Sequence, residues 1–170
     1  STIVEIEKIT KESPTQKSIT LFCAVLKKEN FELVVQKTTE CGIQKIIPII
    51  TTRTVKTGLN MERLQKIAKE ACEQSGRNYL PEIFEPIIFE ESLEKAKENE
   101  INIIFDASGE LLGNLNDKSS IGIWIGPEGG WTPEEIKKAT ENNFSVASLG
   151  TNILRGETAA IIASYLAQNL

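Results

Sequence analysis

Short apolar runs alternate with amphipathic segments along most of this 170-residue chain. Runs with the length of a buried strand lie at residues 19–25, 43–50, 82–89, 101–106, 121–125 and 145–149. Apolar residues at helical spacing predict helices at 29–41, 61–75, 92–99, from 133 onward and at 157–169. This alternation predicts an α/β fold, with a mostly parallel sheet that helices cover on both faces. Ligands of such sheets bind beyond the carboxyl ends of the strands, so the loops there are the candidates for a functional site.

The composition indicates a globular domain with a core of its own, since 40% of the residues are hydrophobic and 25% are charged. The longest apolar runs are far too short to cross a bilayer, and no basic segment followed by an apolar one opens the chain. We therefore expect a cytoplasmic protein with no membrane contact. The chain has no histidine, and its three cysteines are widely spaced, so no metal is expected. The cysteines are interpreted as buried small apolar residues.

The charge balance bears on nucleic-acid binding, because 19 basic and 24 acidic residues give a net charge of −5. Such a balance argues against broad attraction to a phosphate backbone, so any contact with RNA must be local. Candidates for such contacts are Lys27, Lys28, Lys37 and Arg53, although lysines on amphipathic helices are usually only solvated. Residues 3–9 alternate like a strand at the very start of the chain. We interpret residues 1–13 as the remnant of a preceding domain and residues 14–170 as the main domain.

Two glycine-containing loops, residues 126–131 and 150–158, each follow a predicted strand and open a predicted helix. Glycine lets a ligand lie against bare backbone, whose N–H and C=O groups can bind an adenine or a ribose. The alternative is a tight turn with a helix cap, which glycine and proline form in many loops. Neither loop has the spacing of a dinucleotide-binding or phosphate-binding signature. With Leu149, Ile153 and Leu154 as apolar lining, the pattern favours one shared pocket for an adenosyl ligand without phosphates.

A resemblance to a known family rests on these loops and on two upstream segments. Residues 125–135 read IGPEGGWTPEE, residues 148–150 read SLG, and residues 153–159 read ILRGETA. Upstream lie ELVVQK at residues 32–37 and QKIAKEACEQSGR at residues 65–77. Together they resemble the ribosomal RNA uracil-N3 methyltransferase family of the SPOUT superfamily, over nearly the whole chain. Two departures are Gly156, where the family usually has threonine, and Cys41, where it usually has leucine.

The resemblance implies a fold, a cofactor and partners. The fold would be a SPOUT-type sheet with a C-terminal trefoil knot, preceded by a small barrel-like RNA-binding domain of which residues 1–13 would be the final strand. The enzyme would be a homodimer that methylates N3 of uracil in 16S ribosomal RNA of the small ribosomal subunit. The cofactor would be S-adenosyl-L-methionine, bound by residues of the two loops: Gly126, Pro127, Gly129, Gly130, Leu149, Gly150, Ile153, Leu154 and Thr158.

Two charged residues of the second loop are the candidates for catalysis. Methylation at N3 requires loss of a proton and stabilisation of charge on the base oxygens, and the chain has no histidine to act as the base. Arg155 is expected to stabilise a uracil oxygen, the alternative being a salt bridge to Glu157 or a contact at the helix end. Glu157 is expected to accept the proton directly or through water, the alternative being a cap of the following helix.

Two further residues and two further functions stay open at the level of sequence. Glu128 has the same ambiguity as Glu157, with a stronger lean toward loop structure. Trp131 either stacks on a base or packs onto the following helix, and the second role is favoured. A SPOUT-type ribose 2′-O methyltransferase would share the cofactor loops and differ in the target pocket. A non-catalytic RNA-binding or assembly protein would keep the fold alone, which the retained Arg155 and Glu157 argue against.

Overall fold

The computed structural model describes residues 17–170, so the interpretation of residues 1–13 as a remnant of another domain lies outside the described residues. The predicted alternation of strands and helices is confirmed. The elements in chain order are β1 (Ser18–Ala24), α1 (Lys28–Glu40), β2 (Lys45–Ile50), α2 (Met61–Ser75), β3 (Glu82–Ile83), β4 (Ile87–Ile88), α3 (Phe89–Lys95), a 3₁₀ turn η1 (Ala96–Glu98), β5 (Ile101–Leu111), β6 (Ser120–Ile125), α4 (Pro133–Glu141), β7 (Ser145–Ser148) and α5 (Gly156–Asn169).

Residues 17–170 form one seven-stranded sheet in the order β3-β2-β1-β6-β5-β7, with β4 also paired to β2. All strand pairs are parallel. Helix α1, which follows β1, packs on one face of the sheet, whereas α4, which follows β6, packs on the other. The loops that leave the neighbouring strands β1 and β6 therefore diverge, and a crevice between such loops is where ligands of parallel sheets bind.

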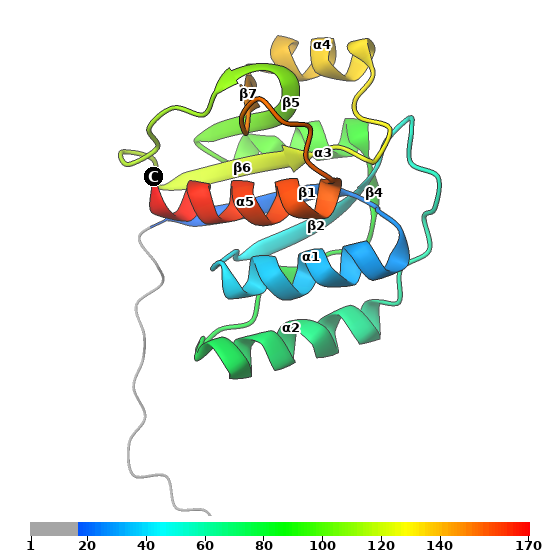
Figure 1. Cartoon of the computed structure of the whole chain (residues 1–170), viewed down its shortest axis with the longest axis vertical. Helices are drawn as coiled ribbons and strands as arrows, with labels where there is room; N and C mark the ends of the chain where they lie inside the picture. Colours follow the sequence, from blue (N-terminus) through cyan, green and yellow to red (C-terminus); the bar gives the residue numbers. More distant parts are fainter. Residues whose placement is uncertain (1–16) are drawn as a thin grey trace, which may run out of the picture.

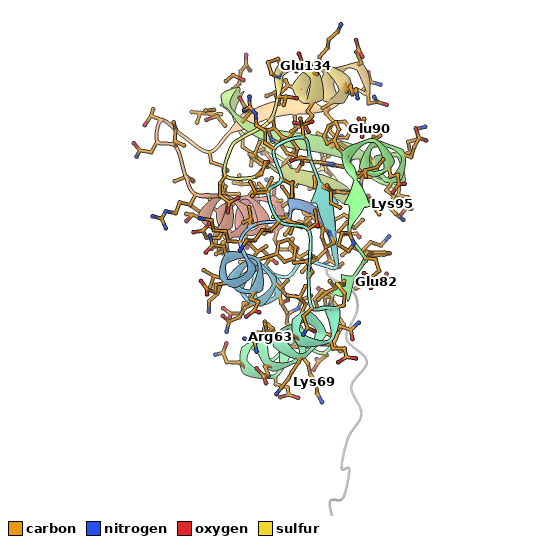
Figure 2. The ribbon with its side chains drawn as sticks, turned by 90° about the vertical axis from the view of Figure 1, so that its right-hand side faces the viewer. Arg63, Lys69, Glu82, Glu90, Lys95 and Glu134 are labelled. Atoms are coloured by element: carbon orange, nitrogen blue, oxygen red, sulfur yellow. The ribbon has the colours of Figure 1, made fainter. Side chains whose placement is uncertain are left out.

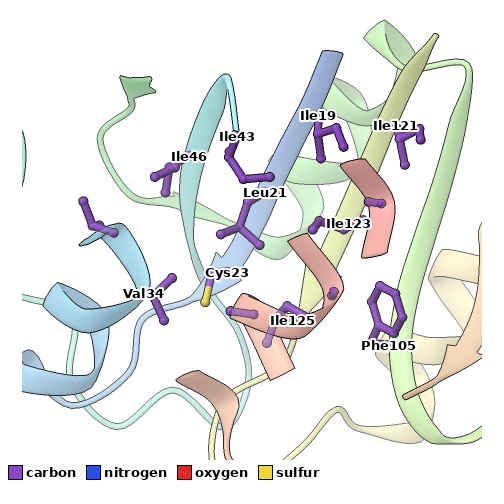
Figure 3. Packing of buried hydrophobic residues seen from close by; sticks show 14 of the residues in the cluster. Ile19, Leu21, Cys23, Val34, Ile43, Ile46, Phe105, Ile121, Ile123 and Ile125 are labelled. Atoms are coloured by element: carbon purple, nitrogen blue, oxygen red, sulfur yellow. The ribbon is translucent and has the colours of Figure 1, made fainter. Parts of the chain in front are cut away.

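Both faces of the sheet are buried, as the mostly apolar strands predict. Helices α1, α2 and α5 cover one face, seen in front of the sheet in Figure 1, and α3 and α4 cover the other. Figure 3 shows Leu21 of β1 and Ile123 of β6 pointing into the first of these layers. Their neighbours Phe22 and Trp124 point into the second layer, where the two rings stack with centroids 3.8 Å apart.

Strand β5 extends beyond its predicted end at Asp106 and bends around β7. Ala147 of β7 pairs with both Phe105 and Glu110, and Figure 1 shows the far end of β5 curving over β7. The bend depends on Gly109, because a Cβ atom there would lie 2.6 Å from the carbonyl carbon of Ala147. Periodicity does not reveal such a close backbone approach, so the bend could not be predicted from the sequence.

The predicted strand at residues 82–89 is wrong in its extent. It divides into the two-residue strands β3 and β4, with Pro86 between them, which has no N–H to donate to the sheet. Phe89 is the first residue of α3 rather than the last of a strand, so the helix predicted at residues 92–99 begins earlier and ends in the 3₁₀ turn.

Charged side chains cover the outer surfaces of the helices. Figure 2 shows Arg63 and Lys69 on α2 and Glu134 on α4, each directed away from the sheet. Within residues 17–170, no helix combines the length and the apolar character that crossing a membrane requires.

Candidate active site

A cavity of about 680 Å³ lies beyond the carboxyl ends of β6 and β7 and beside residues 105–107 in the middle of β5. Both glycine-containing loops line it, through residues 125–131 and through residues 148–150 and 152–157. The structure therefore brings the two loops, which follow β6 and β7, to one shared pocket, as their positions after two late strands predict. Of the predicted cofactor-binding residues, those at the cavity are Gly126, Pro127, Gly129, Gly130, Leu149, Gly150, Ile153 and Leu154.

Thr158 is the predicted cofactor-binding residue that the structure does not bring to the cavity. It lies in the first turn of α5 and is half-buried, whereas Ala159 and Glu157 on either side of it line the cavity. Successive residues of a helix point about 100° apart, so two neighbours that reach the cavity need not bring the residue between them. Any effect of Thr158 on a ligand passes through the start of α5.

The first loop, residues 126–131, is here called the glycine loop. Its turn is closed by the Gly130 N–H, which donates to the Pro127 carbonyl at 2.8 Å, and Gly130 has a φ of +69°. Trp131 is buried, and its indole N–H donates to the Phe105 carbonyl at 3.0 Å. Gly126 lies under that indole, because a Cβ atom there would come within 3.1 Å of the ring. Trp131 therefore packs into the core, with its ring centroid 5.6 Å from that of Phe89 on α3, whereas the sequence favoured packing onto the following helix.

Neighbouring segments hold the glycine loop in place through hydrogen bonds. The Lys27 backbone N–H donates to the Glu128 carboxylate at 3.2 Å, so Glu128 has the structural contact toward which its sequence context leans. Arg53 Nη1 donates to the Gly129 carbonyl at 2.7 Å and to the Trp131 carbonyl at 3.1 Å. Arg53 thus has a structural role at the protein backbone, and its contact with RNA stays a prediction.

The second loop turns at Gly150, whose φ of +125° favours glycine. The Ser148 hydroxyl accepts from the Gly150 N–H at 3.2 Å and donates to the Gly150 carbonyl at 2.9 Å, which fixes the start of the loop. Leu149 and Leu154 are half-buried in the cavity wall, whereas Ile153 is 91% exposed. The loop therefore combines an apolar wall with backbone groups that stay open to a ligand.

Arg155 and Glu157 stand together at the start of α5 and both line the cavity. Arg155 is exposed, and within residues 17–170 its guanidinium forms no ion pair, so the alternative of a salt bridge to Glu157 does not apply. Glu157 is only 8% exposed, and its Oε2 is buried without a hydrogen-bond partner among the described residues. A buried polar atom without a partner is unusual in a native structure and indicates a place for a ligand or water.

Two carboxylates of the site raise the pKa of a buried thiol, that of Cys23. Cys23, at the end of β1, is fully buried, and burial raises the pKa of its thiol. The nearby carboxylates of Glu128 and Glu157 raise that pKa further, because a thiolate beside them would add negative charge. Cys23 therefore stays protonated, in agreement with its interpretation as a small apolar residue.

Gly156 allows α5 to begin close to the end of β1. A Cβ atom at this position would lie 2.9 Å and 3.1 Å from the two terminal methyl carbons of Leu26, and 3.5 Å from the Gly126 carbonyl oxygen. Leu26 is itself fully buried, which limits its freedom to move. Leu26 thus fills the space that a larger residue at position 156 would need.

Two other segments line the cavity that sequence reasoning did not assign to it. The first segment is residues 105–107 in the middle of β5, and the second is the start of α1 with Lys27 and Asn30. A signal for the first segment was present, because Asp106 ends a predicted apolar run next to the strand that precedes the glycine loop. Among the residues considered for phosphate contacts, Lys27 lies at the cavity, whereas Lys37 pairs with Glu40 at 2.9 Å.

Comparison with known proteins decides the family, since the RNA methyltransferase domain matches residues 11–168. The chain belongs to this RNA methyltransferase family. It is 38% identical over 170 residues to ribosomal RNA small subunit methyltransferase E of Rickettsia conorii, covering 94% of this chain and 68% of that protein. The predicted family is therefore confirmed.

Solved structures extend this likeness. The enzyme of the same name from Neisseria gonorrhoeae, solved bound to S-adenosyl methionine, is 34% identical, with a TM-score of 0.82, over 92% of this chain and 67% of that one. The TrmH/SpoU tRNA modifying enzyme of Aquifex aeolicus, at 20% identity, shares the fold alone, with a TM-score of 0.61 over 91% of this chain and 76% of that one. Across eight curated relatives, the chain spans between 55% and 71% of their length.

Proposed function

We propose that the chain uses S-adenosyl-L-methionine to methylate N3 of a uracil base in 16S ribosomal RNA. The observation that carries this proposal is the shared cavity, in which two glycine-containing loops meet the start of α5 with Arg155 and Glu157 at its wall. Family membership supports the reaction class, and small-subunit RNA is the substrate that the names of its curated relatives state.

The cavity fits the proposed cofactor in size and in character. Its volume of about 680 Å³ lies in the usual range for small-molecule sites, roughly 300 to 1,000 Å³. Apolar side chains of Ile125, Leu149 and Leu154 offer contact to an adenosyl group, and the glycines expose backbone groups for its polar edge. The residues that would hold the cofactor are Gly126, Pro127, Gly129, Gly130, Leu149, Gly150, Ile153 and Leu154.

When bound, S-adenosylmethionine supplies an electrophilic methyl group, which passes to N3 as the carbon–sulfur bond breaks and the sulfur keeps the electron pair. The two loops orient the reactants, since in-line attack requires the nitrogen and the methyl carbon to be aligned. Arg155 donates hydrogen bonds to a uracil oxygen and stabilises the negative charge that builds there as the N3 proton leaves. Its guanidinium is exposed at the cavity and unpaired within the described residues, so it is available for this role.

Glu157 receives the N3 proton, directly or through one water. Its unpartnered Oε2 gives it an open acceptor position inside the protein. The carboxylate belongs to the first turn of α5 and lies at the wall of the cavity. The proton therefore moves to a carboxylate at the cavity wall.

The remaining proposals concern the whole chain. The last helix forms a trefoil knot, which is supported by the way β5 passes on two sides of β7 and by the Leu115 N–H that donates to the Leu170 carbonyl at 3.3 Å. The enzyme is a cytoplasmic homodimer. A dimer is supported by the exposed Tyr165 on α5 beside α1, and sedimentation at about 50 µM, well above ordinary dimer dissociation constants, checks it.

The experiment for the reaction is transfer of a labelled methyl group from S-adenosylmethionine to 16S ribosomal RNA, followed by nuclease digestion and identification of the labelled nucleoside. We expect N3-methyluridine from the wild-type chain. Arg155→Ala and Glu157→Gln should each lower kcat about 100-fold or more, as removal of one charge-stabilising or proton-transfer group does in other enzymes. Label on a ribose oxygen would instead identify a 2′-O methyltransferase, and no label at all would favour a non-catalytic protein.

A further inference from the structure

The loop between β2 and α2, residues 51–60, reaches the glycine loop from outside the cavity. Besides the two hydrogen bonds from Arg53 Nη1, the hydrocarbon part of that side chain lies against Gly129. A Cβ atom at Gly129 would be 3.3 Å from Cδ and 3.4 Å from Cβ of Arg53. Arg53 does not line the cavity. It is therefore placed to act on the glycine loop and not on a ligand in the cavity.

Local structure fixes the direction of Arg53. The Thr54 N–H donates to the Thr51 carbonyl at 3.1 Å, and the Thr51 N–H donates to the Thr54 hydroxyl at 2.9 Å, so residues 51–54 form a closed turn. Between them, the Thr52 N–H donates to Glu135 Oε1 at 2.9 Å, which attaches the turn to the start of α4. The backbone on both sides of Arg53 is thus held, and its guanidinium has a short, defined path to the two carbonyls.

The glycine loop needs such support. Three of its six residues are glycine, which has the greatest backbone freedom of any residue, and a ligand that orders a free loop loses affinity to that ordering. A hydrogen bond from a charged donor is roughly twice as strong as a neutral one. One guanidinium nitrogen that bonds the carbonyls of residues 129 and 131 holds the exit of the loop in one shape before any ligand arrives.

We propose that Arg53 is a positioning residue for S-adenosylmethionine, which preorganises the glycine loop by binding its Gly129 and Trp131 carbonyls. The inference rests on the proposed function, since it assumes that this cofactor binds in the cavity. Arg53 itself touches no reacting atom. Its loss should weaken cofactor binding without abolishing the chemical step.

The test is calorimetric titration of S-adenosylmethionine into the full chain and three variants. Arg53→Met keeps the hydrocarbon stem and removes the donors, and we expect its affinity to fall about tenfold, the effect of losing charged hydrogen bonds. Arg53→Lys should recover part of the affinity, because an ammonium can donate to a carbonyl but lacks the planar fork. Arg63→Met is the matched control. Arg63 lies at the start of α2 and donates two hydrogen bonds to Glu32 of α1 and none to the glycine loop.

Kinetics separate positioning from a general structural role. In the methyl-transfer assay, Arg53→Met should raise KM for S-adenosylmethionine about tenfold while kcat at saturating cofactor changes less than threefold, as expected for lost binding shared by ground and transition states. A folded Arg53→Met variant with wild-type cofactor affinity would overturn the proposal, as would an Arg53→Lys variant that binds the cofactor no better than Arg53→Met. Absence of binding by the wild-type chain would overturn the proposed function together with this inference, whereas equal binding by wild type and Arg53→Met overturns the inference alone.

Discussion

At the scale of single residues, the site depends on positions where glycine is required and on one carboxylate that lacks a partner. The glycine loop turns at Gly130 and the second loop at Gly150, both at positive φ. Glu157, whose Oε2 is buried and has no partner among the described residues, lines the cavity from the first turn of α5. Sequence reasoning identified these residues by type and spacing. It could not show that the Glu157 carboxylate is buried, because burial depends on how α5 packs.

The first prediction concerns Gly130. Gly130→Ala should destabilise the fold by about 1 kcal/mol and weaken cofactor binding, because a side chain is strained in the left-handed region that a φ of +69° requires. No atom lies within 4 Å of the added methyl group, so strain and not collision causes the loss. Gly113→Ala is the control, since Gly113 also has open space around it and no positive φ is recorded there. Equal urea midpoints for the two variants would contradict the prediction.

The second prediction concerns Gly156 and Leu26. Gly156→Thr should destabilise the fold by about 1 to 3 kcal/mol, the usual cost of overpacking, because its Cβ would lie 2.9 Å from a buried Leu26 methyl carbon. Leu26→Val shortens that side chain and makes room. In urea unfolding, the double variant should therefore lose less stability than the sum of the two single variants. Strict additivity would show that the two side chains do not compete for this space.

At the scale of elements, α4 is tied to a loop far away in the sequence by one carboxylate. Thr132 caps the helix in the capping box that the sequence predicts, with its hydroxyl accepting from the Glu135 N–H at 3.2 Å. The Glu135 carboxylate then accepts from the Thr132 N–H at 2.8 Å and from the Thr52 N–H at 2.9 Å. The cap was predictable because its partners lie three residues apart. The bond to Thr52 was not, because it depends on tertiary structure.

The third prediction follows from these two bonds. Glu135→Gln should destabilise the fold by about 1 to 3 kcal/mol, since an amide accepts at one oxygen only and leaves the N–H of either Thr132 or Thr52 facing a donor. Glu134→Gln is the matched control, because Glu134 is next to Glu135 in the chain but is exposed and takes no part in the capping box. Chemical unfolding of both variants measures the difference. A Glu135→Gln variant as stable as Glu134→Gln would show that the bond to the β2–α2 loop contributes nothing.

The same contrast between local and tertiary causes explains which elements were predicted correctly. The bounds of α2 follow from its apolar spacing and from Gly76, whose φ of +71° ends the helix. The far half of β5 has no buried residue and no apolar run, so its pairing with β7 rests on the close backbone approach at Gly109. The cavity wall formed by Asp106 depends on that same bend. Local sequence patterns therefore located the two loops of the cavity, whereas tertiary packing brought residues 105–107 of β5 to it.

At the scale of the whole molecule, the central strands of the sheet are so completely buried that a reagent should contact their side chains only when the protein unfolds. Cys23 lies in β1 at the centre of the sheet with no exposed surface. Its raised pKa makes stability depend on pH, because the thiol of the unfolded chain ionises at a lower pH than the buried thiol of the folded chain. The contribution of Cys23 to folding stability is therefore fully present below the unfolded pKa of about 8.5 and is lost progressively as the pH rises above it. Thiol reactivity at Cys23 thus reports on global unfolding.

The fourth prediction uses that thiol as a probe. Alkylation of Cys23 at pH 8 should require global opening, whereas half-buried Cys41 should react through local fluctuations. S-adenosylmethionine at about 100 times its dissociation constant should slow Cys23 labelling about 100-fold, because a ligand that binds only the folded chain stabilises it by about 2.7 kcal/mol. Mass spectrometry of digested peptides distinguishes the two cysteines. Labelling of Cys23 at the rate of Cys41, with or without cofactor, would contradict a closed core.

The central claim is that the cavity between the two loops is the cofactor site of a methyltransferase. The most direct measurement is a crystal structure of this chain with S-adenosylmethionine or S-adenosylhomocysteine bound. The account predicts the ligand in contact with backbone atoms of residues 126–131 and of residues 149–154, with Glu157 Oε2 hydrogen-bonded to ligand or water. A ligand bound elsewhere on the chain, with neither loop in contact, would contradict it.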